Sequence, residues 1–198
     1  MRPDPLSITV RRAAREDALA LIHLIAALAE FERLEPPDAD AQARLVRDGW
    51  PEEGARPRFT AWLAEIDDGP EGKPQAVGYA ITFETYSSFL ARPTLYIEDI
   101  FVLPSYRRRA VGTALMRRLI QEAWESGCGR MEWVVLEWNE GAQQFYRRLG
   151  AQHLTEWQYY RLRREEMPAA LGAMDGPSIQ APTPACGHPS PKNRGGKR

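Results

Sequence analysis

The chain has 198 residues, of which 43% are hydrophobic and 27% are charged, and its net charge is −1. This composition is ordinary for a globular domain with one hydrophobic core, and the charge gives no sign of binding to nucleic acid or to a membrane surface. No stretch approaches the ~20 apolar residues of a membrane span, and the first residues lack an apolar signal-peptide core. We therefore expect a cytoplasmic protein.

The cysteines and histidines are scattered. Cys128 and Cys186 lie far apart and fit no Cys-x-x-Cys or Cys/His spacing. We expect neither a disulfide framework nor a bound metal.

The N-terminal half predicts an antiparallel meander preceded by helices. Apolar residues at 21, 24, 25 and 28 have the spacing of one helix face, and the pair Pro36-Pro37 ends that helix. Asp67 to Pro74 is a strong turn signal between two strands. In chain order we expect a strand over 8–11, the helix, a shorter helix over 38–48, and strands over 59–66, 76–83 and 94–102.

The second half predicts a strand-helix-strand crossover. Residues 110–125 are helical, with Leu115, Leu119 and Ile120 on one side, and the apolar run 131–136 is typical of a strand buried on both faces. A short helix over 141–149 and a last strand over 153–162 follow. This order indicates an α/β sheet.

After Met167 the composition changes to proline, glycine and basic residues without apolar periodicity. We expect a folded domain over 1–167 and a disordered tail over 168–198.

The most informative stretch is a strand that runs into a small-residue basic turn, which in turn opens a helix. Such a turn presents backbone N–H groups and the positive end of the helix dipole to an anion. A solvated basic helix cap is the alternative. The residues of this turn are Arg107, Arg108, Arg109, Ala110, Val111, Gly112 and Thr113.

The turn resembles a known family. Arg107-x-x-Ala110-x-Gly112, after a strand that ends Glu-Asp-Ile-Phe-Val, resembles the pyrophosphate loop of the GNAT acetyltransferases, Arg/Gln-x-x-Gly-x-Gly/Ala, with alanine at the first glycine. Trp138-Asn139-Glu140 followed by Phe145-Tyr146-Arg147-Arg148-Leu149-Gly150 is similar to the segment after the family's fifth strand. Three further segments narrow the resemblance to the diamine (spermidine/spermine) branch: Leu28-Ala29-Glu30-Phe31-Glu32, Tyr96-Ile97-Glu98-Asp99-Ile100-Phe101-Val102 and Glu137-Trp138-Asn139-Glu140.

The resemblance covers residues 8–162 and implies a GNAT-like mixed α/β fold: a mostly antiparallel central sheet with splayed middle strands and flanking helices. It also implies acetyl-CoA as cosubstrate and a homodimer. Glu98 would take the proton of the amine, and Tyr146 would donate to the leaving thiolate. The alternatives are that Glu98 is a strand carboxylate paired with an arginine and that Tyr146 is a tyrosine packed between helix and sheet.

Further contacts follow from the same resemblance. Main-chain groups of Ile100, Phe101 and Val102 and the side chain of Asn139 would hold the pantetheine arm, although asparagine also fits a helix N-cap at that place. Phe31 and Glu32 would border the amine. The acidic group Glu30, Glu32 and Glu35 attracts a cation or is a solvated face.

One departure from the branch concerns the acceptor. The branch has an acidic residue before the last strand, where this chain has Trp157 or Gln158, and Tyr160 stands in place of a tryptophan. The aromatic group Trp157, Tyr159 and Tyr160 either holds a cation over its ring faces or serves as core and dimer contact. A shorter amine thus competes with a long polyamine.

The leading hypothesis is direct transfer of an acetyl group from acetyl-CoA to a primary amine of a small cationic molecule: a polyamine, a thialysine-like compound or an amino-acid amine. No nucleophile elbow for an acyl-enzyme is present. The alternatives are a protein lysine or N-terminal acetyltransferase, and a non-catalytic CoA-binding regulatory module. The basic tail of such a module would contact nucleic acid or a partner, but its four positive charges give only weak, salt-sensitive attachment, so we expect no nucleic-acid partner.

Overall fold

The computed structural model describes residues 7–67 and 73–174. It divides into two compact units, 1–134 and 135–198, and each is described by itself. The predicted turn over 67–74 falls mostly outside the described residues, as does the tail after residue 174.

The first unit is built on a five-stranded sheet in the order β1-β2-β3-β4-β5. The strands are β1 (Ile8–Arg12), β2 (Thr60–Ile66), β3 (Gln75–Ser87), β4 (Arg92–Val102) and β5 (Arg130–Trp133). Neighbours from β1 to β4 are antiparallel, whereas β4 and β5 are parallel. The predicted mixed, mostly antiparallel α/β sheet is therefore confirmed.

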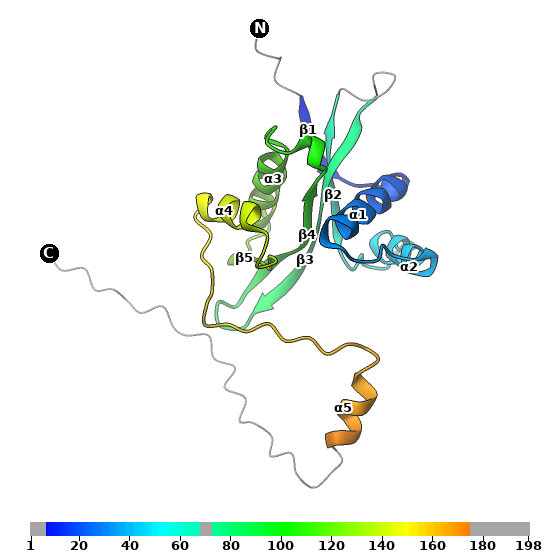
Figure 1. The fold of residues 1–198 in the computed structure, drawn as a ribbon, viewed down its shortest axis with the longest axis vertical. Helices are drawn as coiled ribbons and strands as arrows, with labels where there is room; N and C mark the ends of the chain where they lie inside the picture. Colours follow the sequence, from blue (N-terminus) through cyan, green and yellow to red (C-terminus); the bar gives the residue numbers. More distant parts are fainter. Residues whose placement is uncertain (1–6, 68–72, 175–198) are drawn as a thin grey trace, which may run out of the picture. The chain divides into compact units, whose positions relative to one another are not determined.

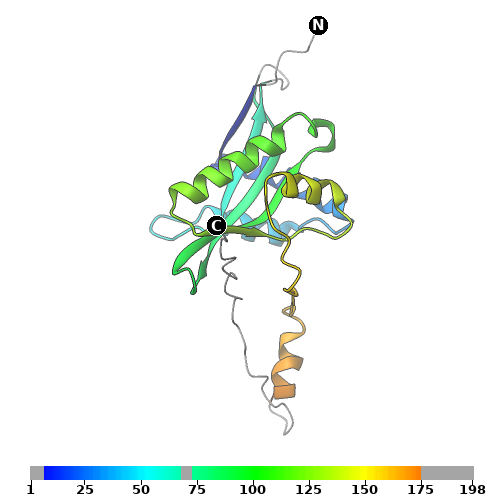
Figure 2. The same ribbon diagram turned by 90° about the vertical axis from the view of Figure 1, so that its left-hand side faces the viewer.

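Helices cover both faces of this sheet. Figures 1 and 2 show α1 (Ala18–Glu32) and α2 (Ala39–Gly49) on one face and α3 (Val111–Glu125) on the other. A short 3-10 helix, Arg15–Asp17, leads into α1, and another, Pro104–Tyr106, follows β4. The parallel β4-α3-β5 crossover is the predicted strand-helix-strand unit.

The core lies between α1 and the sheet. Its fully buried members include Leu21 on α1, Leu63 on β2 and Tyr79 on β3, and Phe31 packs against them at the end of the helix. The helix α1 ends at Glu32, and the next residue, Arg33, adopts a left-handed conformation at φ 59°, three residues before the prolines. On the opposite face Leu115 and Leu119 are buried as predicted, but Ile120 is 46% exposed; the buried residues of α3 are Val111, Leu115, Met116, Leu119 and Ala123.

The predicted strand over 131–136 is shorter than expected and lies at the edge of the sheet. β5 ends at Trp133 and its residues are half-buried, while Val134 and Leu136 are exposed. The prediction that it is buried on both faces was wrong: all residues of β5 are half-buried, and within the described residues the strand has a neighbour on one side only.

The second unit contains α4 (Glu140–Arg148) and α5 (Met167–Met174). The strand predicted over 153–162 is wrong, since these residues form no ladder. Alternating bulky residues favour a strand, but a strand needs a partner edge, and the described part of this unit offers none. Helix α5 also differs from the disorder expected after Met167.

Candidate active site

The middle of β4 contains a bulge that reorients two acidic residues. Ile81 of β3 pairs with Asp99 and its neighbour Thr82 pairs with Ile97, so Glu98 is an extra residue in β4. Bulges of this kind twist a strand and redirect its side chains. Glu98 is exposed, whereas Asp99 turns back toward the α1 face and is half-buried.

Asp99 forms a titratable pair that sequence reasoning did not select. The hydroxyl of Tyr79, which is fully buried on β3, donates to the Asp99 carboxylate at 3.1 Å. Burial raises the pKa of Asp99 to about 6, the Tyr79 hydrogen bond opposes that rise, and the charges of Glu98 and Glu32 add to it. The adjacent letters Glu-Asp were visible in the sequence, but the bulge that separates their environments was not.

The end of β4 leaves an open strand edge. β4 pairs with β5 only through Thr94–Ile97, and β4 then continues to Val102 beyond that ladder. In the described residues, the edge at Ile100, Phe101 and Val102 that faces away from β3 therefore has no strand partner. A splay of the middle strands would leave such an edge, and the splay itself stays a prediction.

The anion loop, residues 107–113, joins this edge to α3. Arg108 and Ala110 are both left-handed, with φ values of 61° and 66°, and Ala110 is the residue before the helix, with no side-chain cap. The first N–H groups of a helix have no partner within it, and a positive dipole end adds to their attraction for an anion. Arg108 and Arg109 are exposed, so two cations stand beside these groups.

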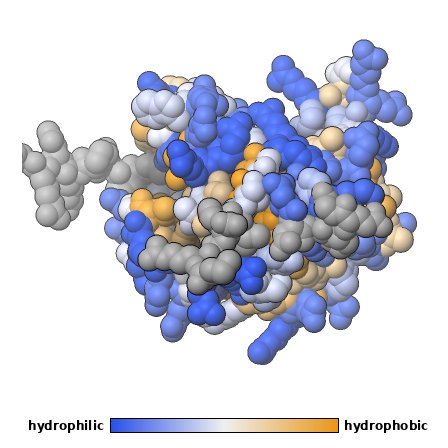
Figure 3. Space-filling view, turned by 90° about the horizontal axis from the view of Figure 1, so that it is seen from above, coloured by the Kyte–Doolittle hydropathy of each residue, from blue (hydrophilic) through white to orange (hydrophobic). Residues whose placement is uncertain are grey.

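Figure 3 views the molecule from above, toward the end of the sheet at which β4 stops; hydrophilic residues are common on this face, with hydrophobic residues between them.

Arg107 is half-buried, whereas its neighbours Arg108 and Arg109 are exposed. Its guanidinium lies 4.3 Å from the ring centre of Phe31 and 5.5 Å from that of Phe101, and its Nε donates to the Val102 carbonyl at 3.0 Å. Burial lowers the pKa of Arg107. The structure thus brings together the end of α1, the end of β4 and the start of the loop.

The three glutamates of the predicted acidic group at the end of α1, Glu30, Glu32 and Glu35, differ in their exposure to solvent. Glu32 is half-buried and burial raises its pKa, whereas Glu30 and Glu35 are exposed. Glu32 is also the member whose charge acts on Asp99. Phe31 and Glu32 therefore lie on the same face of the sheet as Asp99.

Tyr146 and Asn139 belong to the second unit. The side chain of Asn139 accepts a hydrogen bond from the Ala142 N–H at 3.2 Å, so it caps α4, the alternative role that its sequence position indicated. Tyr146 lies on α4, its ring 5.6 Å from that of Phe145, and burial raises its pKa to about 12. The approach of either side chain to Glu98 stays a prediction.

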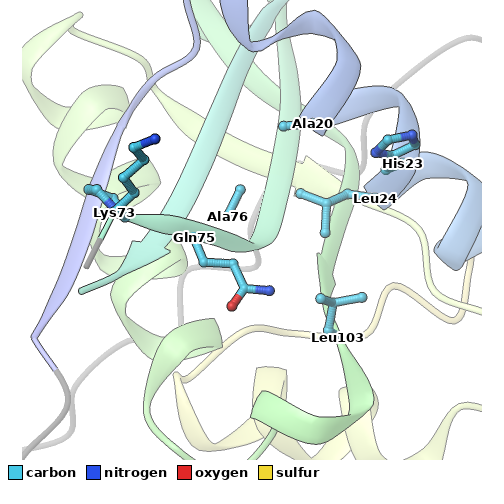
Figure 4. Close-up of a pocket in the computed structure, with 8 residues that line it drawn as sticks. Ala20, His23, Leu24, Lys73, Gln75, Ala76 and Leu103 are labelled. Atoms are coloured by element: carbon cyan, nitrogen blue, oxygen red, sulfur yellow. The ribbon is translucent and has the colours of Figure 1, made fainter. Parts of the chain in front are cut away.

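A pocket of about 480 Å³ lies elsewhere on the first unit. Figure 4 shows its lining: Ala20, His23 and Leu24 from α1, Lys73, Gln75 and Ala76 around the start of β3, and Leu103 after β4. None of the predicted site residues lines it. Among the described residues there is no group of three or more His, Cys, Asp or Glu suited to a metal ion, and no helix long and apolar enough to cross a membrane.

Comparison with known proteins identifies the family. Residues 22–151 match the acetyltransferase (GNAT) family. The thialysine N-epsilon-acetyltransferase of Bos taurus is 34% identical over 171 residues, which are 83% of this chain and 98% of the relative. The spermidine/spermine N(1)-acetyltransferase-like protein 1 of Homo sapiens is 32% identical over 163 residues, 80% of this chain and 23% of the relative.

A solved structure agrees at the level of the fold. An integron cassette protein from the mobile metagenome of V. cholerae superposes with a TM-score of 0.68 at 20% identity, covering 83% of this chain and 98% of its own. The bulged strand, the open edge and the left-handed anion loop thus lie in a chain that belongs to the GNAT acetyltransferase family and is similar to its thialysine and diamine acetyltransferases.

Proposed function

We propose that this enzyme transfers the acetyl group of acetyl-CoA to a primary amine of a small cationic molecule, by direct attack in a ternary complex. The observation that carries the proposal is the match to a thialysine N-epsilon-acetyltransferase over 98% of that relative's length. A polyamine, a thialysine-like compound and an amino-acid amine are the candidate acceptors.

The residues present fit a CoA thioester. The left-handed loop, the uncapped start of α3 and the exposed Arg108 and Arg109 suit its phosphates, while the open edge of β4 suits an amide-bearing arm. When bound, this cosubstrate supplies the activated acyl group. Backbone groups of residues 100–102 would orient it, and Asn139 would add a contact from the second unit.

The chain must also deprotonate the acceptor. An alkylammonium with a pKa of ~10.4 is neutral in only about one molecule in 10³ at pH 7, which costs roughly 4–5 kcal/mol. Glu98 is proposed to accept this proton, directly or through water, from its exposed position at the bulge. Tyr146 is proposed as the donor to the leaving sulfur, since a phenol with a pKa of about 12 is protonated at neutral pH.

The acceptor side is proposed to be the half-buried end of α1. Glu32 would attract the cation and Phe31 would border its carbon chain. Trp157 or Gln158 stands where the diamine branch has an acidic residue that could hold a distant second ammonium, and the bovine relative is named for thialysine. A short amine is therefore favoured over a long polyamine. A homodimer and a cytoplasmic location remain predictions.

The experiment follows thiol release from acetyl-CoA with spermidine, putrescine, thialysine, lysine and a lysine peptide at several pH values. Strong turnover of one small amine that rises with pH is the expected result. Acetyl-CoA binding without turnover of any amine would contradict the proposal and favour a protein acceptor or a non-catalytic CoA-binding module.

Two variants with matched controls test the proposed residues. Glu98→Gln and Tyr146→Phe should each lower turnover by about 10²-fold or more while the affinity for CoA stays close to that of the parent protein. Glu84→Gln and Tyr86→Phe change an exposed glutamate and an exposed tyrosine on β3 and should leave turnover unchanged. Unchanged turnover in Tyr146→Phe would remove Tyr146 from the mechanism.

A further inference from the structure

Arg107 makes three contacts that its neighbours in the anion loop do not make. Its guanidinium lies over the ring of Phe31 at the end of α1, close to the ring of Phe101 on β4, and its Nε donates to the Val102 carbonyl. The two rings are themselves 6.2 Å apart, tilted by 49°. A single side chain therefore joins α1, β4 and the loop.

The orientation of this guanidinium suits packing rather than phosphate binding. Arginine recognises a phosphate with the edge of its planar fork, through parallel N–H donors. The guanidinium carbon of Arg107 instead lies 4.3 Å from the ring centre of Phe31, and its Nε already donates to the Val102 carbonyl. Arg108 and Arg109 are exposed, and the Arg109 guanidinium lies 5.7 Å from the ring centre of Tyr106, a longer contact than that of Arg107 with Phe31.

The loop is also attached to the sheet through its main chain. The Leu103 N–H donates to the Val77 carbonyl at 2.9 Å, and the Tyr106 N–H donates to the Leu103 carbonyl at 2.9 Å. These bonds hold the segment before Arg107. After it, Arg108 and Ala110 are left-handed, so the loop requires a further contact to keep its conformation.

We infer that Arg107 is a positioning residue: it locks the anion loop onto Phe31, and so couples the cofactor side of the site to the acceptor side. The inference rests on the proposed acetyl transfer and deepens it. If Arg107 acted only as a phosphate ligand, its loss would weaken binding of acetyl-CoA and nothing else. As a positioning residue, it also maintains Phe31 and therefore the geometry offered to the amine.

The test compares two acetyl donors with the same amine. Acetyl-CoA carries phosphates and S-acetylpantetheine carries none. Arg107→Gln should lower kcat/KM with both donors by about ten- to a hundredfold and should raise the KM for the amine, because small displacements of reacting groups are costly. Arg108→Gln, the matched control, should lower kcat/KM with acetyl-CoA alone.

A lysine variant separates charge from stacking. Arg107→Lys keeps the positive charge but loses the planar group and the Nε donor. We expect it to be no better than Arg107→Gln with either donor. Recovery in Arg107→Lys, or loss confined to acetyl-CoA in Arg107→Gln, would overturn the inference.

Two further measurements keep the test decisive. If Arg107→Gln does not fold, Phe31→Leu removes the same contact from the other side and should reproduce its effect on both donors. If the parent protein acetylates no amine, the proposed function fails, and the dissociation constants for CoA and pantetheine then test the positioning role: Arg107→Gln should weaken both, and weakening of CoA alone would refute it.

Discussion

Ala110 is an alanine in a left-handed conformation, and its replacement by glycine tests the description of the anion loop. The φ of 66° places its Cβ against the following carbonyl, which costs an L-residue about 1–2 kcal/mol. Glycine removes this cost but adds about 0.4–1 kcal/mol of chain entropy to the unfolded state. Ala110→Gly should therefore raise the free energy of unfolding by about 0.5–1 kcal/mol.

Ala114, one turn further along α3, provides the matched control. Its N–H donates to the Ala110 carbonyl at 2.9 Å within the regular helix, where glycine is worse than alanine by about 1 kcal/mol. The same substitution thus has opposite signs at two positions four residues apart. For a chain of this size 1 kcal/mol shifts Tm by about 2–4 °C, so thermal unfolding followed by calorimetry or circular dichroism resolves the two variants.

A fall in Tm for Ala110→Gly that equals the fall for Ala114→Gly would refute the left-handed assignment. The affinity for CoA provides a second readout. Because the loop's backbone conformation is retained, Ala110→Gly should bind CoA at least as tightly as the parent chain, and weaker binding would show that the alanine side chain itself contributes to the site.

Three other predictions concern stability. Hydrogen bonds from Arg11 lower the pKa of Asp17, so the stability they provide is present above pH ~4 and is lost as the pH falls through the folded pKa. Asp17→Asn should therefore make the free energy of unfolding depend less on pH in the acid range. The pKa of Asp99 is raised to about 6, so the carboxylate lowers the free energy of unfolding as the pH rises through that value. Asp99→Asn should therefore raise the free energy of unfolding by up to about 3 kcal/mol at pH 8 and by little at pH 4, measured by urea unfolding. No gain at pH 8 would contradict this prediction. Gly78→Ala would bring its Cβ within 2.8 Å of a backbone oxygen of β4 and should lower stability by about 1–3 kcal/mol in the same assay, so a stability equal to the parent's would refute the close approach.

The sequence by itself determined most of the order of elements. Strands β1 to β4 and helices α1 to α4 lie within a few residues of their predicted ranges, because periodicity and turn residues act between close neighbours in the chain. The anion loop could also be predicted from the sequence, because its arginines, its small residues and the start of the helix follow one another in the chain. Glu98 and Tyr146 lie in the strand and the helix predicted for them, and the roles that the resemblance implies for them stay predictions.

What only the tertiary structure decided depends on contacts between distant segments. The bulge opposite Ile81 exposes Glu98 and buries Asp99, and it arises from pairing between β3 and β4. Arg107 packs on Phe31, 76 positions earlier in the chain, which no local pattern indicates. The strand predicted over 153–162 is absent for the same reason: alternation describes one segment, whereas a strand exists only where a second segment supplies its hydrogen-bond partners.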